Sequence, residues 1–145
     1  MTQPTYASGL LFTKAHRLVR ARIYVVLDSY GLNPSYWAIL GAAVSAPDGI
    51  RLATVAKLMD VKAPLVTMLS SHLIKEGLIN RIPHHSDKRA KLLVATHKGK
   101  KLASQIETEL VAEISALMNG VNVRDARSFQ STLEAIIANA ENLQV

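Results

Sequence analysis

Two short segments with helical periodicity stand close together in the middle of this chain, and they constrain its fold more than any other feature. The first is Leu52–Met59, the second runs from about Ala63 to Glu76, and only Asp60-Val61-Lys62 separates them. Two helices joined by so short a turn are typical of a helix-turn-helix. The second segment also carries an apolar stripe, which turns a small, polar and basic face outward; the inward residues are Val66, Leu69, Leu73 and Ile74.

The spacing of apolar residues changes after Gly77, which ends the second segment. Leu78–Ile82 and Lys91–Ala95 are runs of the β-strand type, and between them lies a charged, turn-rich stretch from Pro83 to Ala90. We therefore expect a β-hairpin with a charged tip directly after the helix pair.

Longer helices are expected on both sides of this central region. Residues 6–30 have apolar positions at helical spacing and end at Gly31, and Asn33-Pro34 begins a second helix that reaches Val44. A helical pattern returns at Lys98, is interrupted at Asn119-Gly120, and resumes over roughly residues 123–143. The predicted fold class is mainly α with a small β-hairpin.

Composition excludes several classes of protein. A chain of 145 residues with 49% apolar content can bury one good core, as one compact domain or two fused lobes, which rules out a multi-domain enzyme. The absence of cysteine excludes disulfides, Cys-ligated zinc and thiol redox sensing, and it fits a reducing compartment. No apolar run reaches the roughly 18 residues of a membrane span and the start lacks the pattern of a signal peptide, so we expect a cytoplasmic protein that does not bind membranes.

Positive charge is concentrated in the middle third of the chain. Residues 51–101 contain eleven Lys or Arg and three Asp or Glu, whereas residues 102–145 contain two and six. Such a distribution favours a localised surface for a polyanion, because nucleic-acid phosphates attract Lys and Arg through counterion release. The alternative is a scattered, solvated charged face.

Three short motifs follow one another in this region. They are Leu73-x-x-x-Gly77-Leu78-Ile79-x-Arg81, Asp87-Lys88-Arg89 and Thr96-His97-Lys98-Gly99. In this order and spacing they resemble the multiple antibiotic resistance regulator (MarR) family of winged helix-turn-helix proteins. The first is similar to the family's passage from recognition helix to wing, the second matches its Asp-x-Arg wing motif, and the third matches the Thr-x-x-Gly start of its next helix. The resemblance covers nearly the whole chain and implies a winged helix-turn-helix flanked by N- and C-terminal dimerisation helices.

The resemblance implies that double-stranded DNA is the partner. An α-helix fits the major groove, where base edges differ in their donors and acceptors. The residues expected to face DNA from the recognition helix are Lys62, Pro64, Thr67, Met68, Ser71, His72 and Lys75. On the wing they are Asp87, Lys88 and Arg89. Arg89 would reach the minor groove, with Asp87 orienting it or bracing the wing; the alternative is a solvated pair of loop residues.

Met68 departs from the family pattern, in which this position is often basic. Methionine cannot make a bidentate contact to guanine, so base recognition must rest on Thr67, Ser71 or His72, or on DNA shape.

The end helices are expected to form a homodimer, as they do in the family. We assign residues 1–33 and 102–145 to this dimerisation region and residues 34–101 to the DNA-binding lobe. The apolar residues expected at the interface are Leu11, Leu18, Val19, Phe129, Leu133, Ile136 and Ile137. A two-fold dimer predicts a pseudo-palindromic operator with half-sites about one helical turn apart. The alternative is that these apolar faces complete a core within one chain.

Members of this family usually respond to a small aromatic or anionic effector bound between the dimer helices and the DNA-binding lobe. The residues on the helices that would line such a cleft are His16, Arg17, Arg20, Tyr36 and Trp37. The alternative is ordinary structure, with Trp37 in the core and Arg20 as a solvated helix charge.

Nothing in the sequence indicates an enzyme, a cofactor or a metal site. The pair His84-His85 with Asp87 lacks a spaced third ligand, so surface histidines are the favoured interpretation. Phosphate loops, zinc-protease motifs and supportable catalytic triads are absent. From the resemblance we predict a sequence-specific DNA-binding regulator, and a repressor rather than an activator, because occupying promoter DNA requires no further contacts. The alternatives are a winged-helix module that binds protein and a ligand-binding protein without specific DNA binding.

Overall fold

The computed structural model describes residues 5–143, which fall into two compact units divided between Glu113 and Ile114. The first unit contains α1 (Thr5–Ser29), α2 (Pro34–Ser45), β1 (Ile50–Arg51), α3 (Leu52–Met59), α4 (Ala63–Lys75), β2 (Ile79–Pro83), β3 (Lys91–Ala95) and most of α5 (His97–Leu117). The second contains α6 (Val123–Asn142). The predicted class, mainly helical with a small hairpin, is confirmed, and β1 is the one element of this series that the sequence analysis did not predict.

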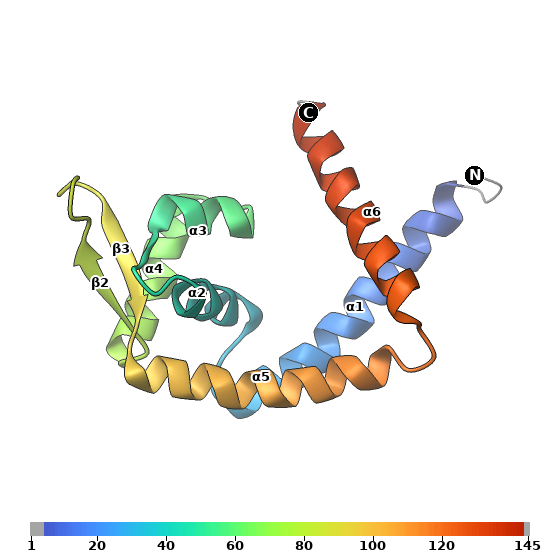
Figure 1. Ribbon diagram of the computed structural model, residues 1–145, viewed down its shortest axis with the longest axis horizontal. Coiled ribbons are helices and arrows are strands. Elements are labelled where there is room, and N and C mark those ends of the chain that lie inside the picture. Colours follow the sequence, from blue (N-terminus) through green and yellow to red (C-terminus); the bar gives the residue numbers. More distant parts are fainter. Residues whose placement is uncertain (1–4, 144–145) are drawn as a thin grey trace. The chain divides into compact units, whose positions relative to one another are not determined.

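Helices α2, α3 and α4 pack together beside the hairpin, and α5 runs along the underside of this lobe (Figure 1). The core lies where these elements meet. Its fully buried side chains include Ile39 and Leu40 of α2, Val55 of α3, and Val66 and Leu73 of α4. Leu27 brings the end of α1 into the same core, and Ile106 brings in the first half of α5. The lobe therefore has a closed hydrophobic core made from every element between α1 and α5.

The turn between α3 and α4 uses a residue in the left-handed region. Asp60 has φ 53°, its N–H bonds to the Lys57 carbonyl, and the next N–H, of Val61, bonds to the Ala56 carbonyl at 3.0 Å. This is the Schellman pattern of helix termination, in which glycine is the usual residue because it has no Cβ. The same pattern ends α4, where Gly77 has φ 71° and Leu78 N–H bonds to the Leu73 carbonyl at 2.9 Å. The C-terminal ends of both helices of the helix-turn-helix are thus fixed by backbone hydrogen bonds.

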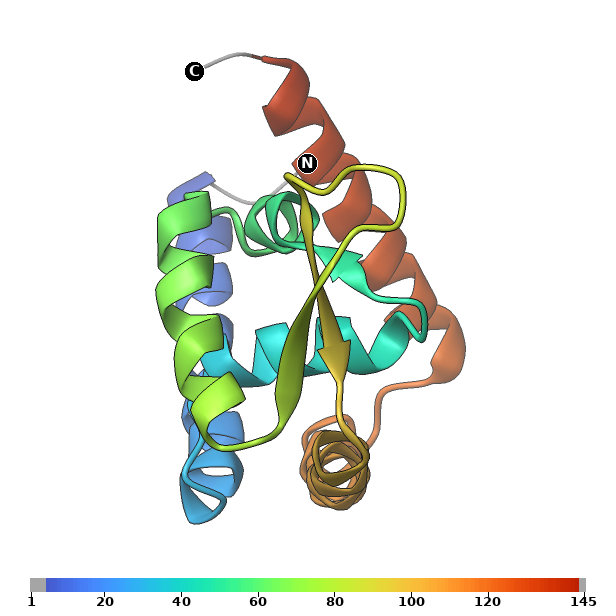
Figure 2. The same cartoon turned by 90° about the vertical axis from the view of Figure 1, so that its left-hand side faces the viewer.

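The sheet is antiparallel, with the order β1-β3-β2. Strand β3 pairs with β2 from Ile79 opposite Ala95 to Pro83 opposite Lys91, and with β1 through Ile50 opposite Leu93. Figure 2 shows this hairpin crossing in front of the lobe, with α4 beside it and the connecting loop at its tip. We call residues 84–90, which connect the strands, the wing loop.

The Thr-x-x-Gly motif has a clear structural reason. Thr96 Oγ1 donates to the Gly77 carbonyl at 2.7 Å and accepts the N–H of Gly99 at 3.0 Å, so it caps the start of α5 and ties it to the end of α4. A Cβ on Gly99 would lie 2.0 Å from the Leu78 carbonyl oxygen. Only glycine allows α5 to approach the base of the hairpin this closely.

Helices α1 and α5 are also joined by polar contacts. The Arg22 guanidinium forms an ion pair with Glu113 at 2.6 Å, and the Tyr30 hydroxyl donates a hydrogen bond to Glu109. This hydrogen bond, with desolvation and the carboxylate charge, raises the pKa of Tyr30 above its ordinary value. These contacts fix the last turns of α1 against α5.

Helix α6 begins at the cap residue Asn122, whose side chain accepts the N–H of Asp125 at 2.8 Å. None of its residues, 123–142, is buried in the described structure. Among residues 5–143 we find no helix of the length and apolarity needed to cross a membrane.

Candidate nucleic-acid interface

The predicted recognition helix, α4, presents the predicted side chains to solvent. Lys62, Pro64, Thr67, Met68, Ser71, His72 and Lys75 are all exposed. The inward stripe is confirmed for Val66 and Leu73, which are fully buried, and Leu69 and Ile74 are half-buried. Because 3.6 residues make one turn, Met68 lies near the middle of the face opposite this stripe, and it is 62% exposed.

Ser70 and Arg81 form a polar contact between α4 and the wing that the sequence analysis did not predict. Ser70 is the buried polar residue of the core, and its hydroxyl donates to the Thr67 carbonyl at 3.0 Å. Arg81, on β2, donates from Nη2 to Ser70 Oγ at 2.9 Å. Its Nε is buried without a hydrogen-bond partner in the described part of the chain. The position of Ser70, one helical turn from Val66 and Leu73, was the available signal, since serine there must find an internal partner.

The two exposed hydroxyls of α4 are turned back onto the helix. Thr67 Oγ1 donates to the Ala63 carbonyl at 3.2 Å, and Ser71 Oγ donates to the Thr67 carbonyl at 2.9 Å. Each hydroxyl has one proton, so in this arrangement both can offer only lone pairs to an incoming base edge.

The side chain of His72 is held in place by a residue of α2. Its ring stacks on that of Tyr36, with centroids 4.6 Å apart and an interplanar angle of 26°. Tyr36 itself is positioned at the start of α2, where its N–H bonds to the Asn33 side chain at 2.9 Å. His72 therefore links the outward face of α4 to the first turn of α2.

The wing loop carries the predicted motif residues at its tip. Asp87, Lys88 and Arg89 are all exposed. Asp87 Oδ1 accepts the backbone N–H of Arg89 at 3.0 Å, so this carboxylate shapes the turn that presents the arginine. The Arg89 guanidinium is thereby carried on a defined turn.

His84 organises the rest of the wing loop. Its Nδ1 lies 3.2 Å from the backbone nitrogens of both Ser86 and Asp87, which donate to it. An Nδ1 that accepts N–H bonds is unprotonated, so we assign the proton of the neutral ring to Nε2. Arg51 Nη2 lies 3.3 Å from Nε2, and because a guanidinium can only donate, this contact is an approach of two donors and not a hydrogen bond. Desolvation, followed by the charges of Arg51 and His85, lowers the pKa of His84 below its ordinary value, and Asp87 opposes this shift. The neutral form is the one that holds the loop together.

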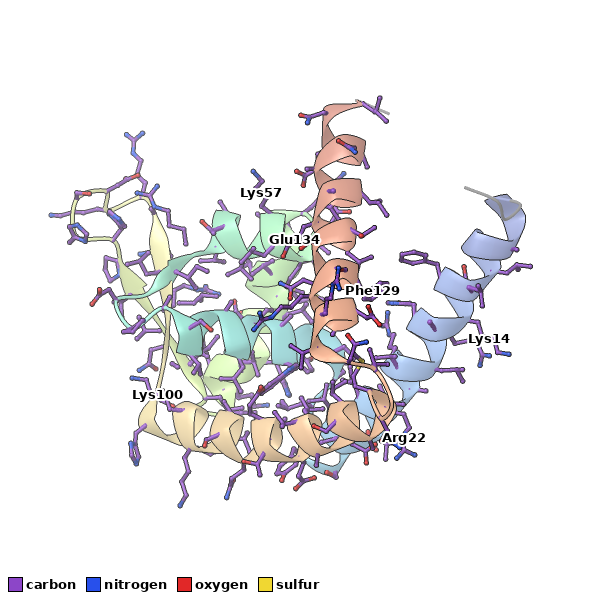
Figure 3. All side chains as sticks on the ribbon, turned by 45° about the vertical axis from the view of Figure 1, so that its right-hand side comes forward. Lys14, Arg22, Lys57, Lys100, Phe129 and Glu134 are labelled. Carbon is purple, nitrogen blue, oxygen red and sulfur yellow. The ribbon has the colours of Figure 1, made fainter. Side chains whose placement is uncertain are left out.

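The basic residues of the middle third are not all on one side of the lobe. Figure 3 shows Lys57 on α3 and Lys100 on α5 at opposite sides. Lys98, at the start of α5, donates from Nζ to the Glu76 carbonyl at the end of α4, at 2.7 Å, where a cation also suits the helix dipole. Part of the positive charge therefore has a structural role, while Lys62, Lys75, Lys88 and Arg89 remain on α4 and the wing loop.

The residues predicted to bind an effector lie in different settings. Trp37 lines a hollow of about 340 Å³ between α2 and α5, which also includes Lys100, Ser104 and Glu107. A second hollow, of about 380 Å³, is lined by Tyr30, His72, Glu76 and Lys98, among others. Among the described residues of α1, His16, Arg17 and Arg20 are exposed and line neither hollow, and Tyr36 contacts His72 instead.

The residues predicted at a dimer interface are largely accessible in the single chain. Leu11 and Leu18 of α1 are 62% and 47% exposed, and Val19 is half-buried. In α6, Phe129, Ile136 and Ile137 are at least half exposed, and Leu133 is half-buried. Among the described residues, we find no group of three or more His, Asp or Glu side chains that could hold a metal ion.

Comparison with known proteins relates this chain to winged helix-turn-helix regulators. Residues 32–91, from α2 to the start of β3, match the model of the MarR family. The transcriptional regulator PA3341 is 28% identical, with a TM-score of 0.82 over 92% of this chain and 98% of that one. The family is one of DNA-binding transcriptional regulators rather than enzymes, as the sequence predicted.

Two further solved structures show relatives with bound partners. CouR from Rhodococcus jostii RHA1, bound to p-coumaroyl-CoA, is similar with 24% identity and a TM-score of 0.84 over 88% of this chain and 90% of that one. MepR from S. aureus, in complex with DNA, is similar with 20% identity and a TM-score of 0.79 over 94% and 99%. These likenesses extend over nearly the whole chain and therefore include the flanking helices as well as the winged lobe.

Proposed function

Because this chain belongs to the MarR family of DNA-binding winged helix-turn-helix regulators, we propose that it acts as a homodimeric repressor on a pseudo-palindromic operator. The observation that carries this proposal is the pairing of an exposed helix face on α4 with an exposed arginine on the adjoining wing loop. A helix in the major groove and a cationic wing in the neighbouring minor groove can contact one half-site together. Repression follows from occupancy of promoter DNA, which needs no further contact.

The basic residues of α4 stand at its two ends. Lys62 precedes the first turn and Lys75 is the last residue, so both can reach phosphates on either side of a groove occupied by the helix. Lys88 and Arg89 supply the contacts of the wing. Asp87 acts on DNA binding indirectly, by holding the backbone of Arg89.

Dimerisation is proposed through α1 and α6. Leu11 and Leu18 on α1, and Ile136 and Ile137 on α6, leave apolar surface in the single chain that a two-fold partner would cover. Sedimentation of the purified protein should give twice the mass of one chain, and Ile136→Glu combined with Ile137→Glu should give a folded monomer. A wild-type monomer at micromolar concentration would refute this part of the proposal.

An effector is proposed in the hollow that Trp37 lines. The indole ring and the Lys100 ammonium suit an aromatic molecule that carries an anionic group, which is the chemistry that CouR binds in its p-coumaroyl-CoA complex. Such a ligand would release DNA only to the extent that it binds a non-DNA-binding form of the dimer more tightly. Quenching of Trp37 fluorescence by aryl carboxylates and their acyl-CoA thioesters, lost in Lys100→Ala, tests this site.

The decisive test of the function is selection from a random pool of duplex DNA at about 150 mM salt, a condition that weakens non-specific binding. We expect enrichment of an inverted repeat whose half-sites are about one helical turn apart. Retention of DNA without enrichment would mean a non-specific binder. Lack of retention would favour a winged-helix module that binds protein.

A further inference from the structure

The outward face of α4 is poor in the groups that usually identify bases. Bidentate contacts to guanine and adenine are made by Arg, Lys, Asn and Gln. The helix, APLVTMLSSHLIK, contains no Arg, Asn or Gln, and its one lysine, Lys75, is its last residue, away from the centre of the face. Its two exposed hydroxyls have their protons engaged by the Ala63 and Thr67 carbonyls. Apart from Lys75 at its end, the remaining side-chain donor of the helix is His72, whose ring is stacked on Tyr36.

Apolar surface takes the place of these groups at the centre of the face. Met68 is 62% exposed and lies opposite the buried stripe of α4, and Leu65, on its flank, is 39% exposed. The side chain of an exposed methionine has no group that hydrogen-bonds strongly to water, and because it is long and unbranched it adapts to many partner shapes. The lysines at the ends of the helix, Lys62 and Lys75, give this apolar centre a cationic border.

The major groove offers one kind of apolar group, the C5-methyl of thymine. We propose that Met68, flanked by Leu65, is a specificity-determining residue that recognises thymine methyl groups, so that each operator half-site is selected by thymines at the centre of the α4 footprint. The cationic border selects DNA over a protein surface as the occupant, because it complements phosphates on both sides of the groove. This inference rests on the proposed function, since it requires that α4 enters the major groove.

The test uses the duplex that the protein selects from a random pool, with each thymine replaced in turn by deoxyuridine. This exchange removes the methyl group and leaves the hydrogen-bonding edge of the base unchanged. At one or two positions per half-site we expect the wild-type affinity to fall about fourfold, the factor for about 0.8 kcal/mol per buried methyl-sized group, and about fifteenfold when both half-sites are changed. Fluorescence anisotropy of the full-length protein measures these ratios.

Two variants assign the effect to Met68. Met68→Ala should bind the unmodified duplex about as weakly as the wild type binds the deoxyuridine duplex, and removal of the methyl should then leave its affinity unchanged. Met68→Leu, which keeps an apolar side chain, should retain the sensitivity, as should the control Ser71→Ala on the same face. Thermal unfolding confirms that each exposed substitution leaves the fold intact.

The outcomes separate this inference from the function on which it rests. Enrichment of an operator with no methyl-sensitive thymine, or equal sensitivity in wild type and Met68→Ala, would overturn the role of Met68 and leave the repressor proposal standing. Failure to enrich any sequence would overturn both. If Met68→Ala changes no DNA affinity but abolishes a protein association, the apolar centre of α4 is a protein-docking surface and the inference is wrong.

Discussion

Helix α4 and the wing loop are held in place by different means, although both are expected to contact DNA. The inner side of α4 is buried, through Val66, Ser70 and Leu73, and its end is closed by the Schellman hydrogen bonds around Gly77. The wing loop, residues 84–90, has no fully buried side chain in the described structure. It is shaped by the hydrogen bonds that His84 and Asp87 accept from the loop backbone.

This difference indicates that α4 and the wing loop have different roles in DNA recognition. A helix fixed by the core presents a constant surface, which suits discrimination between bases, while a loop fixed only by local hydrogen bonds can adjust to the shape and width of a groove. The surfaces agree with this division, because the centre of α4 is apolar and the wing tip is cationic. Four predictions test how separate the two elements are.

The largest effect is expected where the two elements join. Gly99→Ala places a Cβ 2.0 Å from the Leu78 carbonyl, so α5 must move away from the junction of α4 and β2. We expect a loss of about 3 kcal/mol in the free energy of unfolding, the upper end of the usual cost of overpacking, since backbone at this contact cannot yield as a flexible side chain would. Urea denaturation measures the loss. The matched control is Gly41→Ala in α2, where a Cβ meets no described atom within 4 Å and helix propensity predicts a gain of up to about 1 kcal/mol.

The wing alone is tested by Arg89→Ala. Because Arg89 is exposed and its backbone N–H, not its guanidinium, bonds to Asp87, the fold should be unchanged. Operator affinity should fall at least about tenfold, and the slope of log affinity against log salt should decrease by about two, one for each wing of the proposed dimer. Lys101→Ala, which removes an exposed charge from α5, is the control and should have a much smaller effect. Equal losses in the two variants would mean that net charge, not the wing, attracts DNA.

The connection between the two elements is tested by a double-mutant cycle on Ser70 and Arg81. We expect Ser70→Ala and Arg81→Met to show a coupling energy of about 1 kcal/mol, because each removes one partner of the same 2.9 Å hydrogen bond. Denaturation of both single variants and of the double variant supplies the cycle. Strictly additive effects would mean that β2 and α4 are held together by apolar packing alone.

The smallest effect is expected from pH. Since the pKa of folded His84 lies below the ordinary value of 6.5, its contribution to stability is complete above pH 6.5 and is lost as the pH falls through the folded pKa. Protonation of Nδ1 removes the acceptor for the amides of Ser86 and Asp87, so these two should lose protection from hydrogen exchange while amides of α4 keep theirs. His84→Asn, whose side-chain carbonyl can accept the same bonds at any pH, should abolish the transition. Parallel loss of protection in α4 would show that the wing and the helix open as one unit.

Much of the fold could be predicted because hydrophobic periodicity and the residues that end helices are local signals. The sequence placed α3 at residues 52–59 as observed, and it placed the ends of α4 and both hairpin strands within about one residue, which is within the usual uncertainty of element ends. Strand β1 was missed because two residues carry no period, and they become a strand only through pairing with Leu92 and Leu93. Helix α5 follows the helical pattern that returns at Lys98, but only its first part is buried: Ile106 and Leu110 lie in the core, whereas Ile114 and Leu117 are exposed in this chain.

Some residues of the candidate site could likewise be predicted from the sequence, and others could not. The exposed residues of α4 and the wing motif could be named from periodicity and from resemblance to a family, and their roles in DNA binding stay predictions that the experiments above test. The roles of Ser70 and Arg81 could not be predicted, because serine is small enough to be overlooked and its partner lies eleven residues away on another element. The same holds for the hydroxyls of Thr67 and Ser71, whose direction depends on side-chain rotation rather than on sequence position.

The sequence by itself determined the order of the helices and the hairpin, the cationic middle third and the resemblance to the MarR family, because each of these depends on residue type and short-range spacing. Only the tertiary structure decided which charges and hydroxyls remain available to a partner. It placed the Lys98 ammonium on the end of α4, directed the Arg81 guanidinium from β2 to Ser70 of α4, and left Met68 at the centre of the outward face. The physical reason is that hydrogen-bond satisfaction is settled by neighbours in space, and packing brings together residues that lie far apart in the chain.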